Sequence, residues 1–564
     1  MSKSALRQQN WARQQNWALL LILLAAFALR ISSIRFGLPA MNDQDELIFE
    51  LGALKMLRGA TLNPGWFGHP ATTTMYVLAI INAAVFGFTL LTGRIASASQ
   101  FGDLVYGDPS WIIVPGRVAM VLFSLGTIWL TYALAKRFFG ERAGLIAGVM
   151  LALNPVHINW SQIIRSDMMG CFFMLLCMQS CAAIGVSAKW RDYLFASLWL
   201  GLAVATKWPF ALTGIAIGSA TLFAMRSGVL PARTATLRMV ASGLLSIVIL
   251  FAASPYLLLD YPTALQNLRG EGQMHHVGAN GGSIWFNLQW YVRGPLQWGF
   301  GLIGLGLAIF GSLQLYRRKL ALAVVMPVAA AFLIMILTQH LIWERWSLPL
   351  MPLGAIIAAW GLVRLAELLA WQPRWPRWTA PVAIAVPVAV LIAMAGLLLL
   401  RDFSDARARM NDTRQLVSAW AKQHIPPGSR VLIEHNAFDL IGQPWTLLFP
   451  MGNAGCVDVV ALIHGRAEYA TIEQARGGQS ILDYGTLPPA RRADCNADFA
   501  LISHEDDYRK ERDLYGSEYG AYLAMYKAGS IAAVYRPVAG KIGGPPMVIV
   551  DLRPSPRVPP VSPR

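Results

Sequence analysis

Long apolar runs recur through the first 400 positions of this 564-residue chain. A run of about 20 such residues is long enough to cross the hydrocarbon core of a bilayer as a helix. Only 14% of the residues are charged and 55% are hydrophobic, whereas soluble domains carry about 25% charged residues. The pattern predicts an all-α polytopic membrane protein with about 11 transmembrane helices, at 17–34, 117–136, 143–160, 168–186, 192–207, 209–225, 237–255, 296–315, 320–338, 348–366 and 379–400.

The formal net charge of +16 could suggest a nucleic-acid partner, but the placement of the basic residues argues against one. Many lie in short loops between apolar runs, and these loops fall on alternate sides of consecutive spans, at 136–144, 187–192, 226–238, 316–319 and 364–378. The positive-inside rule makes that face, and with it the N-terminus, cytoplasmic. The opposite face then carries the segments 35–116, 161–167, 207–209, 256–295, 339–347 and everything after Arg401.

One apolar segment complicates this count. Residues 75–93 are uncharged and long enough to span, yet a span there would reverse the side of every later loop. We therefore expect a helix that lies on or dips into the outer face. A true span, compensated by one counted in excess, is the alternative.

The composition changes after Arg401. Residues 412–435 read as a helix ended by Pro-Pro-Gly and followed by a strand, and 497–505 and 531–537 read as further strands. We expect a membrane domain at 1–400 with its first outer loop at 35–116, a small extracytoplasmic α/β domain at 401–550, and a Pro-rich disordered tail at 551–564. An oxidising compartment favours a Cys456–Cys495 disulfide, with two unpaired thiols as the alternative.

The loop 41–74 holds the most unusual charges. Asp43, Asp45 and Glu46 lie within a few residues of the predicted end of the first span, where a carboxylate is costly unless it is solvated, paired or used. Acidic residues also suit the N-terminus of a helix. Because this site adjoins a membrane span, we interpret the loop as the carrier of a catalytic acid or base.

Other candidate residues fall on the same predicted face. Asp167 lies at a turn between two apolar runs; it could cap a helix, and Arg165 could pair with it. Basic side chains there could bind a phosphate: Arg117, Lys207 and Arg345. Four histidines share this face, His69, His275, His276 and His340, but their spacing is weak evidence for a metal site.

The order of these motifs resembles the membrane glycosyltransferases of the GT-C fold, the family of dolichyl-phosphate-mannose protein O-mannosyltransferases and bacterial aminoarabinose transferases of lipid A. The resemblance covers most of residues 15–400. It rests on the QDE triplet ending at Glu46, where relatives usually have PDE, and on the segments 62–70, 116–168, 203–210, 254–262 and 345–352.

The resemblance implies an inverting transfer of a hexosyl or pentosyl group from a polyprenyl-phosphate-sugar donor, on the extracytoplasmic face of a bacterial inner membrane. The acceptor would be a glycan, a lipid or a protein. Asp45 would be the base, with Glu46 and Asp167 as further catalytic residues. The donor phosphate would be bound by Arg117, Lys207, Arg345, His69 and Arg165. A divalent metal cofactor is left open, because some relatives bind a metal and others do not.

Two other functions fit parts of the sequence. A transporter or flippase of lipid-linked saccharides typically shows mirrored halves and ionisable groups at the midplane, and the chain has no such halves. A receptor or scaffold that uses the tail domain would leave the carboxylates of the first loop unexplained.

Overall fold

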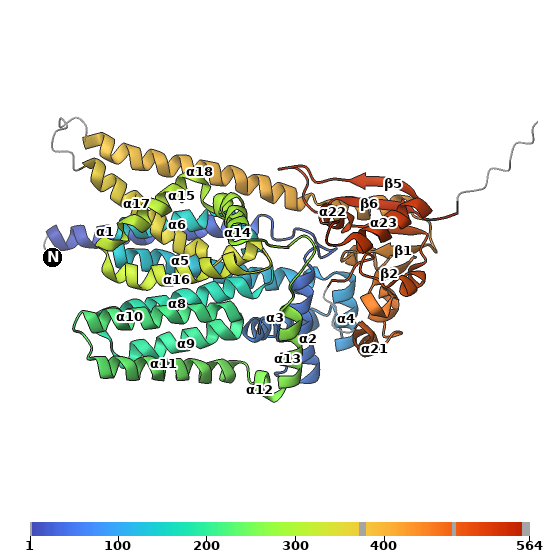
Figure 1. The fold of residues 1–564 in the computed structure, drawn as a ribbon, viewed down its shortest axis with the longest axis horizontal. Coiled ribbons are helices and arrows are strands. Elements are labelled where there is room, and N and C mark those ends of the chain that lie inside the picture. Colours follow the sequence, from blue (N-terminus) through green and yellow to red (C-terminus); the bar gives the residue numbers. More distant parts are fainter. Residues whose placement is uncertain (1–2, 371–379, 477–480, 555–564) are drawn as a thin grey trace, which may run out of the picture.

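The computed structural model describes residues 3–370, 380–476 and 481–554. A long helical bundle is followed by a C-terminal domain at one of its ends (Figure 1). The helices of the bundle are α1 (Lys3–Ile31), α5 (Ser110–Phe139), α6 (Glu141–Ala152), α7 (Pro155–Ser161), α8 (Ser166–Ser187), α9 (Trp190–Thr206), α10 (Gly214–Arg226), α11 (Ala232–Ala253), α15 (Gln297–Gln314), α16 (Lys319–Thr338), α17 (Leu350–Ala370) and α18 (Ala380–Met410). The remaining helices of this part are α2 (Gln44–Gly59), α3 (Thr72–Leu91), α4 (Ala98–Gly107), α12 (Tyr256–Leu259), α13 (Tyr261–Glu271) and α14 (Ile284–Tyr291).

Every span expected from the sequence coincides with helical structure. Within the described residues, nine helices are long and apolar enough to cross a membrane, and the pair α6 and α7, bent by 61°, would make a tenth. The expected spans at 17–34 and 192–207 correspond to shorter segments, Trp17–Ile31 of α1 and the 17-residue α9. The polytopic helical architecture is therefore confirmed.

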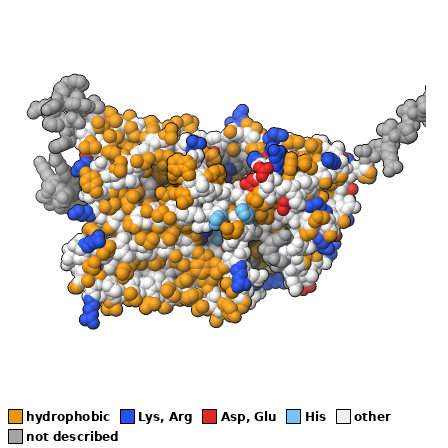
Figure 2. Space-filling model, viewed as in Figure 1, with side chains coloured by type: hydrophobic (Ala, Val, Ile, Leu, Met, Phe, Trp, Pro, Cys, Tyr) orange, Lys and Arg blue, Asp and Glu red, His pale blue; other side chains and the backbone are white. Residues whose placement is uncertain are grey.

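The side chains on the surface of the bundle are of the apolar kind that a lipid bilayer requires. Figure 2 shows hydrophobic side chains over the body of the bundle, while Lys and Arg gather at its far end and near the C-terminal domain. Inside, helices approach closely where side chains are absent. A Cβ on Gly311 of α15 would clash with the Ile357 carbonyl oxygen of α17, and one on Gly361 would clash with the Leu307 carbonyl oxygen. These two glycines allow α15 and α17 to pack backbone against backbone.

Helix α3 contains most of the segment 75–93 and lies at the end of the bundle that faces the C-terminal domain (Figure 1). Leu78 of α3 faces Gly116, in the second turn of α5. Phe86, further along α3, contacts Phe101 of α4, with 5.3 Å between the ring centroids. Although α3 is apolar enough to span, it runs crosswise to α8 and α11 in Figure 1, which favours the expected position on the outer face.

The C-terminal domain is built on a six-stranded sheet of order β3-β2-β1-β4-β6-β5. Strand β1 pairs in parallel with β2 and β4, and the other pairings are antiparallel. The strands are β1 (Arg430–Ile433), β2 (Thr446–Pro450), β3 (Cys456–Asp458), β4 (Phe499–Ile502), β5 (Ser530–Tyr535) and β6 (Met547–Asp551). The helices are α19 (Thr413–His424), α20 (Val459–Ile463), α21 (Tyr469–Arg476), α22 (Glu505–Lys510) and α23 (Gly516–Ala528).

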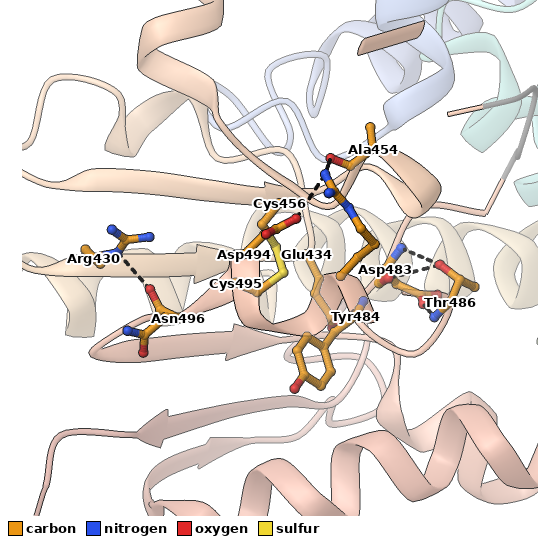
Figure 3. The surroundings of a disulfide bond; sticks show 11 residues. Arg430, Glu434, Ala454, Cys456, Asp483, Tyr484, Thr486, Asp494, Cys495 and Asn496 are labelled. Atoms are coloured by element: carbon orange, nitrogen blue, oxygen red, sulfur yellow. Dashed lines mark hydrogen bonds and ion pairs between the residues drawn. A yellow bond between two sulfur atoms is a disulfide. The ribbon is translucent and has the colours of Figure 1, made fainter. Parts of the chain in front are cut away.

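The helix and the three strands expected in this domain correspond to α19, β1, β4 and β5, whereas β2, β3 and β6 were not predicted. The expected boundary at Arg401 falls inside α18, which continues to Met410. Residues 555–564 of the expected disordered tail lie outside the described residues. Cys456 and Cys495 form a disulfide that joins β3 to the segment before β4, close to Glu434 and Tyr484 (Figure 3).

Candidate active site

The site begins at the N-terminus of α2, where the chain leaves the first helix of the bundle. The Asp43 side chain caps α2 by accepting a hydrogen bond from the Asp45 backbone N–H at 3.0 Å. Successive residues of an α-helix are rotated by about 100°, so the adjacent Asp45 and Glu46 point in different directions. This rotation separates the two carboxylates into different environments.

The Glu46 carboxylate faces inward and forms a closed ion pair. Arg117 of α5 donates from Nε and Nη2 to its two oxygens, at 2.8 and 2.6 Å, and the Ile164 backbone N–H donates at 2.9 Å. The third Arg117 nitrogen, Nη1, donates to two carbonyl oxygens of the 34–36 turn, each at 2.8 Å. Both side chains of the pair are 0% exposed. This arrangement favours a structural role for both residues over the predicted catalytic and phosphate-binding roles, since neither can reach a ligand without breaking the pair.

The Asp45 carboxylate faces outward and is 33% exposed. Arg165, at the N-cap of α8, pairs with it and also donates to Asp43 at 3.1 Å. On another side, Nη1 of Arg345 lies 4.0 Å from an Asp45 oxygen. Asp45 therefore lies between two cations and keeps part of its surface free.

A second ion pair lies beside the first. Lys207, at the C-cap of α9, donates from Nζ to Oδ1 of Asp167 at 2.7 Å. Asp167 is in the first turn of α8, next to Arg165, and both members of the pair are almost completely buried. The other Asp167 oxygen, Oδ2, has no hydrogen-bond partner within the described residues. One carboxylate oxygen is thus left for a ligand or a water molecule.

The segment 62–70 reaches this site through its backbone. Pro70 and Lys207 form an isolated antiparallel bridge, in which the Trp208 N–H donates to the His69 carbonyl at 2.7 Å and the Ala71 N–H to the Thr206 carbonyl at 3.2 Å. The bridge fixes His69 next to Lys207. We refer to it below as the main-chain bridge.

The His69 ring is held by other rings and remains neutral. Its centroid lies 5.1 Å from that of Trp66 and 5.9 Å from that of Phe49, and Nδ1 lies 3.4 Å from Ser166 Oγ. Burial lowers the pKa of His69 well below its usual value, and the charges of Lys207, Arg345 and Arg165 lower it further. A neutral imidazole can donate one hydrogen bond and accept another.

The same three cations act on Asp45. Burial raises the pKa of this carboxyl, but the charges of Arg165, Arg345 and Lys207 outweigh burial and lower the pKa below the usual value. The Asp45 side chain is therefore a carboxylate at neutral pH. The structure thus brings Asp45, His69 and the three cations together, from four separate segments of the chain.

Arg345 comes from the short helical turn Glu344–Ser347 that precedes α17. Its guanidinium carbon lies 4.4 Å from the centroid of the Trp343 ring. The His276 ring also contacts Trp343, with 5.0 Å between the two ring centroids. Sequence reasoning missed Asp43 as a partner of Arg165, and Trp343. A carboxylate at the N-cap position and an aromatic two residues before an arginine were the available signals.

Sequence reasoning also missed Glu271 at the end of α13. Its Oε1 lies 2.7 Å from where a Cβ on Gly68 would be, next to His69. Burial raises its pKa, and the charge of Asp45 raises it further. Among the residues that the structure describes, no group of three or more His, Cys, Asp or Glu is placed to hold a metal ion.

The chain is similar to one protein family and to several solved structures. Residues 100–258 match the family model described as dolichyl-phosphate-mannose-protein mannosyltransferase. No curated protein matches the chain significantly. Among solved structures, ArnT from Cupriavidus metallidurans bound to undecaprenyl phosphate has a TM-score of 0.52 and 15% identity, over 97% of this chain and 98% of that chain. Its apo form gives 0.51 and 15%, over 96% and 98%.

An oligosaccharyltransferase from Archaeoglobus fulgidus, tethered with an acceptor peptide, gives a TM-score of 0.49 and 10% identity, over 93% of this chain and 73% of that chain. The ArnT likeness alone carries the argument about the fold. Because the family match covers α5 and α8, which supply Arg117, Arg165 and Asp167, it includes part of the charged site. Residues 100–258 are thus similar to this family, and the ArnT likeness shows that the chain has the GT-C fold of a multi-pass membrane protein.

Proposed function

We propose that the chain transfers a sugar, with inversion, from a polyprenyl-phosphate donor to an acceptor hydroxyl or amine on the extracytoplasmic side of the membrane, with Asp45 as the base. In this reaction the acceptor oxygen or nitrogen bonds to the anomeric carbon while the bond from that carbon to the phosphate oxygen breaks. The acceptor proton passes to Asp45, and the polyprenyl phosphate leaves with the bonding electrons.

The observation that carries the proposal is the environment of Asp45. Its carboxylate is ionised and partly exposed, it lies 4.0 Å from Arg345, and the charge of Lys207 also acts on it. A base must be deprotonated and able to reach the acceptor. Its neighbour Glu46 cannot reach the acceptor, because it is completely buried against Arg117.

Lys207 and Arg345 are the proposed partners of the leaving phosphate. Cations that are already in place stabilise the charge that develops on a departing oxygen. Arg165 is committed to Asp43 and Asp45, so we assign it to holding Asp45. Neutral His69 would supply a hydrogen bond rather than a charge.

The donor class is supported by two comparisons. The family model that matches residues 100–258 is described as dolichyl-phosphate-mannose-protein mannosyltransferase, and one similar structure is of ArnT bound to undecaprenyl phosphate. The basic loops lie at the far end of the bundle, and the positive-inside rule makes that end cytoplasmic. The site lies at the opposite end, which supports an extracytoplasmic location. The sugar and the acceptor are determined by neither observation.

The experiment uses the purified full-length chain in lipid vesicles that contain an undecaprenyl-phosphate-linked sugar. We expect free undecaprenyl phosphate to form when envelope membranes are added as acceptor, at the same rate as sugar enters the acceptor fraction. A transporter or flippase would instead move the lipid-linked sugar between leaflets without releasing free undecaprenyl phosphate. Translocation without release, for every donor sugar tried, would overturn the proposal.

A further inference from the structure

The loop that carries Arg345 is not held by the membrane helices alone. Residues 339–343 pair with residues 279–281 through their backbones: the Gly281 N–H donates to the His340 carbonyl at 2.7 Å, and the Ile342 N–H donates to the Ala279 carbonyl at 2.9 Å. Any shift of the loop 274–282 is therefore passed to the segment that leads into Trp343 and Arg345.

The C-terminal domain in turn binds the loop 274–282 through hydrogen bonds. Glu511, directly after α22, accepts hydrogen bonds on Oε2 from Asn280 Nδ2 at 2.6 Å and from the Gly278 N–H at 3.3 Å. Asn280 Nδ2 also donates to the hydroxyl of Tyr515 at 3.2 Å. The Asn280 amide oxygen accepts from the His276 N–H at 3.1 Å, which closes the turn. The two Glu511 bonds end on a carboxylate and are therefore of the stronger kind.

An apolar contact accompanies these polar ones. Val277 is 6% exposed and packs within the hydrophobic cluster of the C-terminal domain that includes Tyr508 and Tyr522. Gly278 has a φ of 76°, a conformation that favours glycine. The loop thus inserts one side chain into the other domain and offers its next backbone N–H to Glu511.

At the far end of the connection lies the site. The His276 ring contacts the Trp343 ring edge to face, and Arg345 lies over Trp343. Tyr291 of α14 holds the Trp343 backbone through hydrogen bonds of 3.3 Å to its N–H and its carbonyl. A continuous set of contacts therefore runs from Glu511 through Asn280 and residues 340–343 to Arg345.

We infer that Glu511 and Asn280 are positioning residues that hold Arg345 in place for the donor phosphate, so that the C-terminal domain controls donor binding in the membrane domain. This inference rests on the proposed function for the role of Arg345. Glu511 touches neither donor nor acceptor and acts through the loop alone. A displacement of about 1 Å at Arg345 would weaken its contact to the phosphate, because a hydrogen bond to a phosphate oxygen needs a donor–acceptor distance of about 2.7–3.2 Å.

The first test is hydrogen–deuterium exchange on the full-length protein in detergent. In Glu511→Ala, the amides of residues 339–347 should exchange about tenfold faster than in the wild type, as expected when a hydrogen bond to a charged group is lost. In the matched control Asp513→Ala, an exposed carboxylate two residues away, exchange should not change. Equal exchange in Glu511→Ala and the control would overturn the inference, whatever reaction the protein catalyses.

The second test is kinetic. With an undecaprenyl-phosphate-linked sugar, Glu511→Ala should raise the apparent KM for the donor about tenfold and change turnover at saturating donor much less. Glu511→Gln, which keeps an acceptor oxygen, should recover part of the loss. A fall in turnover with an unchanged donor KM would mean that the domain is merely destabilised, and would overturn the positioning role. If the wild type releases no undecaprenyl phosphate, the proposed function fails, and the exchange result still decides whether Glu511 holds the Arg345 loop.

Discussion

Two neighbouring carboxylates, Asp45 and Glu46, have opposite surroundings. Glu46 is completely buried, and it is bound by Arg117 through two hydrogen bonds and by a backbone N–H. Asp45 is one-third exposed and lies at 4.0 Å from Arg345. In the Glu46–Arg117 pair both carboxylate oxygens accept hydrogen bonds. Asp45 and Arg345 are too far apart to hydrogen-bond each other, so each can still bind another group.

The difference shows how one helix can provide a structural and a chemical residue side by side. Breaking a buried ion pair leaves an uncompensated charge inside the protein, so Arg117 and Glu46 fix α2 against α5. Arg345 is 4.0 Å from Asp45, and Arg165 also pairs with Asp45, so Arg345 can turn to a ligand without leaving this carboxylate unpaired. Adjacent positions can be tested separately for the two roles.

The largest expected effect is on turnover. Asp45→Asn should reduce sugar transfer about 10²- to 10⁴-fold, the range that a general base contributes. The protein should still insert and unfold normally, because Asp45 is partly exposed. The measurement is release of undecaprenyl phosphate per folded molecule, with Asp103→Asn, an exposed aspartate of α4, as the matched control. Near-normal release of undecaprenyl phosphate by Asp45→Asn would show that Asp45 is not the base, and Asp45 and Glu46 would no longer differ in role.

The next effect concerns stability. Arg117→Leu leaves Glu46 buried without its partner and should lower the free energy of unfolding by about 3–5 kcal/mol, measured by thermal unfolding in detergent. The exposed Arg58→Leu, in the last turn of α2, should change stability little. The donor KM of the molecules that remain folded should not change. A stable Arg117→Leu protein with a raised donor KM would instead restore the phosphate-binding role first predicted for Arg117.

A smaller effect is expected at Arg345. Arg345→Gln should raise the apparent KM for the donor about tenfold or more, because a charged contact to the phosphate is lost. Its stability should change by less than about 1 kcal/mol, since the contact to Asp45 is long and partly exposed. Arg345→Lys, which keeps the charge but not the planar guanidinium, should lie between. An unchanged donor KM with a large loss of stability would mean that Arg345 has a structural role, as Arg117 has beside Glu46.

The smallest effect is a shift in a pH profile. The pKa of Asp45 is lowered, so this carboxylate stays charged as the pH falls from 7 through the usual aspartate range, and its stabilising contacts are lost only below that range. Arg165→Gln removes one of the cations that lower this pKa. The acid limb of the donor kcat/KM profile should then move to higher pH. An unmoved limb would show that the limb does not report Asp45.

Much of this arrangement follows from the sequence. Length and apolarity predict the helices, and the charge of the loops assigns 161–167, 207–209 and 339–347 to one face. That assignment brings Asp167, Lys207 and Arg345 to the same end of the bundle as Asp45, where the structure has them. Their roles in the reaction stay predictions.

The remainder depends on contacts that no local pattern contains. Which of Asp45 and Glu46 faces inward depends on the rotation of α2 about its axis, and Arg117, 71 residues away, determines this rotation. The edge strand β3 has three residues and intermediate burial throughout, so it shows no alternating pattern. The grip of Glu511 on Asn280 joins positions 231 residues apart, and neither residue stands out in the sequence.

The main-chain bridge between Pro70 and Lys207 has a consequence for how such proteins diverge. Its hydrogen bonds use only peptide groups, at His69, Ala71, Thr206 and Trp208, so they impose few demands on which amino acids occupy those positions. Side chains around the bridge can therefore be exchanged to suit another sugar while the lysine ammonium keeps its location. A scaffold joined in this way can preserve its reaction centre even when most of its residues have been replaced.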